Sequence, residues 1–172
     1  MTSSENIVIR ELDFKEWEQF KNIRLYSIKE EPLAFGSTYD AESQRTPEEW
    51  KNLLTAKERN WLFADNGNRL IGIIGTIQNF RNEGNHIAYI VAFFVGSAYR
   101  KQGIGKQLLE AIIQKLKKNP EITSIRLGVT ITQKDALKFY EDSGFKKIYI
   151  RKNEVKVFDR YYDEYEMELV AY

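Results

Sequence analysis

The fold is decided by residues 86–117, HIAYIVAFFVGSAYRKQGIGKQLLEAIIQKLK. The first ten of these residues are apolar nearly throughout, which is typical of a central strand buried on both faces. After them, apolar residues recur at helical spacing: Ile104, Leu108, Leu109, Ile112, Ile113 and Leu116. Residues 117–120, KKNP, suit the C-terminus of a helix. The stretch therefore predicts a buried strand, a glycine-bearing turn and a helix.

Two helices and a short strand are predicted upstream of this stretch. Residues 7–11 form the strand, and the apolar residues from 14 to 28 follow a helical spacing that Pro32 should end. A second helix begins at residues 46–49, TPEE, where a cap hydroxyl, a proline at the first helical position and a glutamate at the third agree. We expect this helix to run to about Asn60.

Strands dominate the rest of the chain. Residues 61–65 and 70–78 are β-rich runs joined by Asn66-Gly67, a pair suited to a tight hairpin turn. Further elements are predicted downstream: a strand at 123–130, a helix at 133–142 stopped by Gly144, and strands at 145–151 and 164–170. With no repeat or linker, residues 1–172 read as a single α/β domain with a mixed sheet and helices on both faces.

Composition excludes several function classes. The chain has no cysteine and only one histidine, which excludes disulfide scaffolds, thiolate and multi-histidine metal sites and a cysteine nucleophile, so no metal is expected. A net charge of +1 argues against a nucleic-acid partner. No apolar run approaches the roughly 20 residues of a membrane span, and the N-terminus lacks a signal-peptide layout. We expect a cytoplasmic protein without a membrane partner.

The turn at residues 100–106, RKQGIGK, is predicted to bind an anion. Glycines let the main chain approach a ligand, and the first turn of a helix offers unpaired N–H groups at its positive end. Residues 96–119 hold six basic residues and one acidic residue, a local charge of about +5. Phosphate is the obvious ligand. The alternative is a glycine that merely starts a helix, followed by solvated lysines.

Two other phosphate-binding motifs fit this turn less well. A Walker A loop requires Ser or Thr after Gly-Lys, where this chain has Gln107. A dinucleotide-binding turn requires glycine where Leu108 stands and an acid at the end of the next strand, which reads Gly128-Val129-Thr130. An oxidoreductase that binds a dinucleotide is therefore the weakest of the functions we consider.

Two segments carry a resemblance to a known family. Residues 95–105, VGSAYRKQGIG, resemble the acetyl-CoA signature of the GNAT superfamily of N-acetyltransferases, an Arg/Gln-x-x-Gly-x-Gly/Ala turn after a central strand. Residues 133–145, QKDALKFYEDSGF, resemble its second signature, although Gln133 stands where asparagine is commoner, and Gly96-Ser97 replaces the usual polar residue and proline. The resemblance implies a mixed, mostly antiparallel sheet whose central strand is splayed from its neighbour by a bulge.

The resemblance also implies an acetyl-CoA site. The amides of residues 102–106 would hold the pyrophosphate, and the backbone of Phe93 and Val95 would pair with the pantetheine arm. The Val95 amide would lie near the thioester carbonyl, where an N–H group stabilises a developing oxyanion. The implied cofactor-binding residues are Phe93, Val95, Arg100, which opens the turn, Lys101, Gln102, Gly103, Ile104, Gly105, Lys106, Gln133 and Tyr140.

Tyr140 matches the family's general acid, which returns a proton to the leaving thiolate. A tyrosine pKa near 10 lies close to that of an alkyl thiol, so this proton transfer is nearly balanced. The alternative is one more core aromatic, since the chain has ten tyrosines.

The base and the acceptor stay open. Tyr89 stands where some family members place a catalytic glutamate, so the candidates for the base are Glu30, Glu31, Glu83, His86 or a water relay. Residues 30–49 carry six acids and one base, a balance of about −5 that could attract a cationic amine such as a polyamine. A solvated acidic loop is the alternative.

These observations predict an acetyl-CoA-dependent N-acetyltransferase that acts on a primary amine of a small molecule, peptide or protein. Direct attack in a ternary complex is favoured, because the chain has no cysteine and no obvious serine nucleophile for an acetyl-enzyme. The alternative is a non-catalytic module that binds or senses acyl-CoA. Both a monomer and a homodimer are compatible with the sequence.

Overall fold

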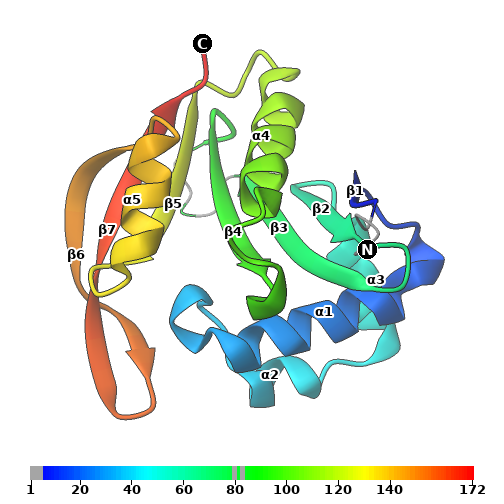
Figure 1. Ribbon diagram of the computed structural model, residues 1–172. Helices are drawn as coiled ribbons and strands as arrows, with labels where there is room; N and C mark the ends of the chain where they lie inside the picture. The colour runs from blue at the N-terminus through cyan, green and yellow to red at the C-terminus, as the bar shows by residue number, and fades with distance from the viewer. Residues whose placement is uncertain (1–5, 79–80, 82–83) are drawn as a thin grey trace.

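The computed structural model describes residues 6–78, 81 and 84–172 (Figure 1). A seven-stranded sheet has the order β1-β2-β3-β4-β5-β7-β6. The strands are β1 (Val8–Arg10), β2 (Arg59–Asp65), β3 (Leu70–Gln78), β4 (Ile87–Val95), β5 (Ser124–Thr130), β6 (Lys146–Val157) and β7 (Arg160–Val170). Only β4 and β5 run parallel among the neighbouring strands of the described residues. The predicted mixed, mostly antiparallel sheet is confirmed.

Helices cover both faces of the sheet, as predicted. The α-helices are α1 (Trp17–Glu30), α2 (Tyr39–Ser43), α3 (Pro47–Thr55), α4 (Ile104–Lys117) and α5 (Lys134–Asp142). Short 3-10 helices are η1 (Phe14–Glu16), η2 (Pro32–Ala34) and η3 (Ser97–Tyr99). In the described part of the chain, no helix has both the length and the apolar composition needed to cross a membrane.

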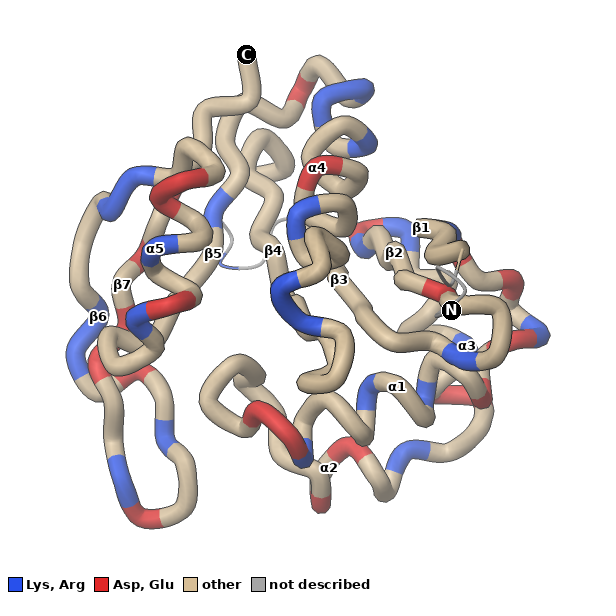
Figure 2. Tube along the Cα trace, in the orientation of Figure 1, with Lys and Arg blue, Asp and Glu red and all other residues tan. Residues whose placement is uncertain are grey.

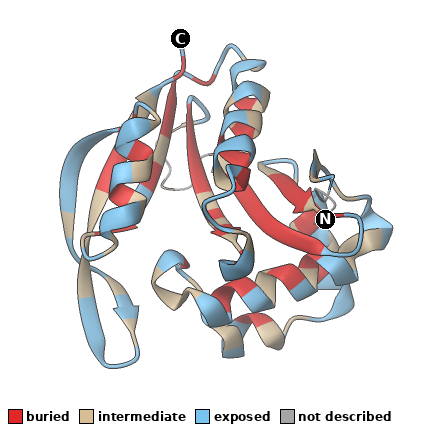
Figure 3. Ribbon diagram, in the orientation of Figure 1, coloured by how far each residue is buried: buried red, intermediate tan, exposed pale blue. Residues whose placement is uncertain are grey.

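Each face of the sheet has its own core, because side chains alternate along a strand. In β2, Leu62 and Ala64 pack into the core under α4 and α5, whereas Trp61 and Phe63 pack into the core with α1 and α3. Phe20 of α1 anchors the second core, with its ring centroid 4.9 Å from that of Trp61 and 5.9 Å from that of Phe63. Figure 3 shows that buried residues line the central strands and the inner faces of the helices. The sheet is thus fixed from both sides.

A bulge divides β4 into two halves. Gly75 of β3 pairs with Val91, but Ile73 pairs with Phe94, so β4 contains one more residue than β3 over this interval. Ala92 has a positive φ of 55°, and the alternation of side chains shifts there by one residue. Ala88 and Ile90 face α4 before the bulge, and Phe93 does so after it.

The parallel strands β4 and β5 separate beyond this bulge. Their pairing covers only Ile87–Tyr89 of β4 and Ser124–Arg126 of β5. Figure 1 shows the two strands diverging toward their C-terminal ends, with η2 and α1 across the open end. The predicted splayed central strand is confirmed, and it gives the sheet a V-shaped gap.

Three boundaries differ from the expected ones. The second predicted helix ends at Thr55, not near Asn60, because Ala56 is extended (ψ 128°) and Asn60 joins β2. There the side-chain amide of Asn60 donates to Thr76 Oγ1 at 3.2 Å. Helix α2, capped by the Thr38 hydroxyl, was not predicted. Strands β6 and β7 extend beyond the predicted bounds to a hairpin closed by the Val157–Arg160 pair, and in this extension only the short alternation Val155-Lys156-Val157 indicates a strand.

Candidate active site

The V-shaped gap between β4 and β5 is the candidate active site. On one face of the sheet, α5 packs against β4 beside the gap. The centroid of the Phe93 ring lies 5.8 Å from that of Phe139 and 6.0 Å from that of Tyr140. On the other side, η2 reaches the end of β5, where Thr130 Oγ1 donates to the Leu33 carbonyl at 3.3 Å. Three segments that are far apart in the sequence therefore enclose one gap.

Beyond Tyr89, the main chain of β4 is not paired with β5 and faces this gap. The His86 carbonyl accepts the Thr123 amide on the β5 side, and the Gly96 amide donates to the Ile71 carbonyl on the β3 side. Backbone groups alternate between the two sides along a strand. With the extra residue at the bulge, this alternation directs the backbone of Phe93 and Val95 toward β5, which has already diverged. An extended ligand could pair there as an additional strand.

The turn after β4 has the geometry of an anion site. Gly103 is the N-cap of α4 with a positive φ of 82°, and Lys101 has a positive φ of 60°. The first intrahelical bond runs from the Gln107 amide to the Gly103 carbonyl, so the amides of residues 104–106 have no partner within the helix. A Cβ added at Gly105 would lie 3.4 Å from the Phe93 ring. Glycine therefore lets this helix start close against the wall of the gap.

The lysine side chains of the turn point into solvent, whereas the Arg100 side chain forms bonds within the protein. Figure 2 shows Lys and Arg gathered at both ends of α4. The Arg100 guanidinium turns back, donates through Nε to the Val95 carbonyl at 2.9 Å and forms an ion pair with Glu31 at 2.8 Å. Lys106 is exposed and only 3.8 Å from Glu110. Arg100 thus ties the end of α1 to the end of β4.

Tyr140 lies buried at the base of the gap with 8% of its surface exposed. Burial raises the pKa of the Tyr140 phenol above its ordinary value, so the hydroxyl stays protonated at neutral pH. Among the described residues, none forms a hydrogen bond with this hydroxyl. Gln133 lies nearby in the sequence as the N-cap of α5, and its amide donates to the Thr130 carbonyl at 2.9 Å. The site therefore contains a neutral proton donor.

Comparison with known proteins identifies the family. The model of the acetyltransferase (GNAT) family matches residues 15–145. The chain belongs to the GNAT acetyltransferase family. No curated protein matches this GNAT chain in sequence. Family membership supports acetyl transfer as its general activity.

Solved structures share the fold of this GNAT protein. An acetyltransferase of the GNAT family from Streptococcus pneumoniae has a TM-score of 0.81 at 20% identity, with 96% of this chain and 99% of that chain covered. A putative acetyltransferase from Salmonella typhimurium, solved with its cofactor acetyl-CoA, has a TM-score of 0.79 at 15% identity, with 96% and 94% covered. The ribosomal-protein-S18-alanine N-acetyltransferase from Escherichia coli has a TM-score of 0.71 at 19% identity, with 96% and 94% covered.

The predicted candidates for the base do not gather at the gap of this GNAT protein. His86 is exposed at the closed end of the V, seven residues before Phe93, which corresponds to roughly 20 Å along a strand. Glu30 is exposed at the end of α1, and Glu31 forms the ion pair with Arg100. Glu83 lies outside the described residues. Geometry therefore favours none of the first three as a base directed into the gap.

A carboxylate that was not predicted lies at the gap instead. Glu164 of β7 is paired across the strands with Thr130, and its side chain lies over Gly128 of β5. A Cβ added at Gly128 would overlap with this carboxylate. An isolated glycine within a strand indicates the close approach of another group, but the sequence does not say which group approaches. Only the register of β5 and β7 identifies Glu164.

Two of the six acids in residues 30–49, Glu31 and Glu42, form ion pairs within the described structure. Glu42 has 3% of its side chain exposed and forms ion pairs with Arg24 and Arg45, each at 3.0 Å. Glu49 accepts the Thr46 amide at 2.7 Å as part of the helix cap. Contacts within the protein therefore offset part of the predicted negative charge, while Glu30, Asp40 and Glu48 are exposed to solvent.

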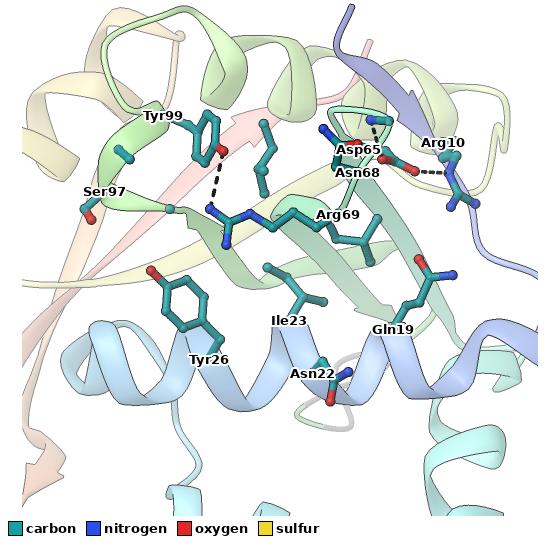
Figure 4. Close-up of a pocket in the computed structure, with 15 residues that line it drawn as sticks. Arg10, Gln19, Asn22, Ile23, Tyr26, Asp65, Asn68, Arg69, Ser97 and Tyr99 are labelled. Carbon is teal, nitrogen blue, oxygen red and sulfur yellow. Dashed lines mark hydrogen bonds and ion pairs between the residues drawn. The ribbon is translucent and has the colours of Figure 1, made fainter. Parts of the chain in front are cut away.

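A separate cavity of about 560 Å³ lies on the α1 side of η3 (Figure 4). An ion pair between Arg10 and Asp65 at 2.8 Å lies at one end, and Arg69 approaches the Tyr99 hydroxyl at 3.4 Å. Tyr140 and Gly105 do not line this cavity. The V-shaped gap is the stronger candidate, because it joins a strand edge that β5 leaves unpaired, the unpaired amides at the start of α4 and the buried hydroxyl-bearing ring of Tyr140.

Proposed function

We propose that this GNAT protein transfers the acetyl group of acetyl-CoA to a primary amine by direct attack within a ternary complex. One observation carries the proposal. The bulge at Ala92 turns the backbone of Phe93 and Val95 toward the open side of the V and sets the Phe93 ring against Tyr140. A strand edge for an extended ligand and a buried proton donor thus meet at one place.

The residues present fit acetyl-CoA. The amides of residues 104–106, at the positive end of α4, offer donors to the pyrophosphate, and Gly103 shapes the approach. Exposed Lys101, Gln102 and Lys106 surround this turn. The backbone of Phe93 and Val95 would hold the pantetheine arm, and Gln133 lies where α5 begins. Arg100 contributes by fixing the Val95 carbonyl instead of contacting phosphate.

Tyr140 would supply the proton for the leaving sulfur. When the amine nitrogen forms its bond to the carbonyl carbon, the negative charge on the oxygen would fall near the Val95 amide, whose N–H group stabilises it. The C–S bond then breaks, and the Tyr140 hydroxyl donates to the thiolate. Burial disfavours a free phenolate, so the hydroxyl gives its proton only as the nitrogen releases one.

A module that binds acyl-CoA without chemistry is the alternative, and the absence of a carboxylate at Tyr89 of β4 is the observation that favours it. Both functions require the anion turn and the open strand edge. They differ in what Tyr140 does: a sensor needs only its ring, whereas an enzyme needs its hydroxyl.

Release of thiol from acetyl-CoA tests the proposal, with pooled polyamines, amino acids, aminoglycosides and peptides that offer a terminal or lysine amine. The protein adds no background, because it has no cysteine. We expect release with at least one pool, and a loss of about 10²–10⁴-fold in kcat for Tyr140→Phe with acetyl-CoA affinity retained. The matched control is Tyr161→Phe, which removes an exposed phenol from the β7 hairpin.

Two outcomes would contradict this proposal. Full turnover by Tyr140→Phe would remove the role of general acid. Acetyl-CoA binding without release in any pool would favour the sensor.

A further inference from the structure

Glu164 occupies the side of the gap opposite Tyr140. Met167 and Tyr165 of β7 pack into the core under α5, so the alternating residue Glu164 points to the other face of the sheet. Thr130, the cross-strand partner of Glu164, projects to that same face and bonds to Leu33 of η2. The carboxylate therefore lies on the face that η2 borders, away from Tyr140.

The Glu164 carboxylate also lies near the point along β5 where β4 and β5 separate. The last pair between the parallel strands is Tyr89 with Arg126. Gly128 is two residues further along β5, so its counterpart on β4 is Val91, next to the bulge. Gly128 remains exposed although the Glu164 side chain lies over it. A small molecule can reach this point from solvent.

Charged groups surround Glu164 from several elements. From β6 come Arg151, which is paired across the strands with Glu164, and Glu154; from the β3–β4 connection comes Arg81, which forms an ion pair with Glu154 at 2.9 Å. On β7 itself, Glu166 is bound by Arg151 Nε at 2.7 Å. The stretch Pro32–Ala34 of η2 brings no charged side chain.

Further along the same face, Glu166 takes most of the strong donors. The Tyr89 hydroxyl donates to its carboxylate at 3.1 Å, and Arg126 lies 3.6 Å away. Arg151 is bound to it as well. These contacts leave Glu164 as the less compensated of the two neighbouring carboxylates.

These surroundings favour the protonated, uncharged form of the Glu164 carboxyl group. Burial, with help from Glu154 and against the effect of Arg81 and Arg151, raises the pKa of Glu164 to about 7. A carboxylate of this kind can take a proton from an ammonium group and release it again near neutral pH.

We infer that Glu164 is the general base of the reaction. This inference rests on the proposed function. The Glu164 carboxylate removes one proton from the ammonium group of the acceptor, and the amine forms the C–N bond to the acetyl carbonyl. The C–S bond breaks as Tyr140 protonates the thiolate. The nitrogen releases its second proton to restore the tyrosine, and Glu164 releases its proton to solvent.

The pH dependence of kcat/KM for Glu164→Gln tests the inference, with the amine that the wild type accepts. In the wild type, activity should rise as pH rises through about 7, because the base must be deprotonated. In Glu164→Gln, we expect a loss of about 10²-fold or more at pH 7. This loss should shrink toward pH 10, where a lysine-like amine loses its own proton.

Two further variants separate chemistry from structure. Gly128→Ala keeps Glu164 but places a methyl group where its carboxylate lies. This variant should therefore lower kcat/KM, as Glu164→Gln does. Glu168→Gln changes a carboxylate on the same face of β7 at the closed end of the V, where it accepts from Ser124, and should leave the pH profile unchanged. Melting temperature and acetyl-CoA affinity are measured for all variants.

If Glu164→Gln keeps the wild-type kcat/KM and the same fall in kcat/KM below about pH 7, the inference is overturned while the proposed function stands. An equal loss at every pH, with lower melting temperature and lower acetyl-CoA affinity, would assign Glu164 a structural role and would overturn it as well. If the wild type releases no thiol with any amine, the proposed function and the inference fail together.

Discussion

Gly103→Ala is the substitution whose consequences follow most directly from the geometry of the turn. Gly103 has a φ of 82°, and nothing lies within 4 Å of the position that a Cβ would take. The substitution therefore causes no steric overlap, and its cost is that of the left-handed backbone alone, about 1–2 kcal/mol. If the turn keeps its shape, this cost lowers the free energy of unfolding. If the turn relaxes, the cost appears when acetyl-CoA binds.

Both the free energy of unfolding and the affinity for acetyl-CoA must be measured, because the cost of the strained backbone is divided between them. The free energy of unfolding comes from denaturant titration, and the acetyl-CoA dissociation constant from calorimetry. A fully relaxed turn would weaken binding by roughly 5- to 30-fold, at 1.4 kcal/mol per factor of ten. Gly103→Asn should lose less, since asparagine tolerates this conformation. Gly36→Ala, whose Cβ also meets nothing within 4 Å, is the control. A Gly103→Ala variant with unchanged stability and affinity would refute the reasoning.

Two further predictions concern stability. Glu42→Gln should cost roughly 3 kcal/mol, because it leaves the Arg24 side chain, only 12% exposed, without its carboxylate partner. Burial acts against ionisation, but Arg24 and Arg45 still lower the pKa of Glu42, so its contribution is present above the ordinary pKa of 4.5 and is lost as pH falls below that value. Acid unfolding of the two proteins should therefore converge; a constant difference would contradict this. Gly75→Ala should destabilise by about 1–3 kcal/mol, measured by denaturant, because its Cβ would overlap with the Trp61 ring; a neutral result would show that the ring can shift.

The anion turn illustrates what local sequence can predict. Gly103 must adopt a positive φ, and helix α4 must bury an apolar stripe; both requirements are set by residues within a few positions of one another. The structure places Gly103 at the start of α4 as expected. The role of Arg100 was not predictable in the same way, since its partner Glu31 caps the C-terminus of α1, 69 positions earlier in the chain.

The gap was expected from the family resemblance, but the residue pattern of the central strand does not show where its bulge lies. The central strand was identified from its apolar run, but a bulge at Ala92 reverses which side chains face α5, and apolar residues on both sides of the strand hide that reversal. The ion pairs of the acidic segment were not predictable for a related reason. The sequence counts charges, whereas folding pairs Glu42 with Arg24 across two helices.

The sequence by itself determined the order of the strands and of the longer helices, the family, and the positions of the glycine turn and of Tyr140. Periodicity, caps and glycine requirements act over short distances along the chain. Only the tertiary structure decided where Glu164 lies. Its approach to Gly128 depends on the antiparallel register of β5 and β7, which joins residues 36 positions apart. A shift of one residue in that register would turn the carboxylate to the other face of the sheet.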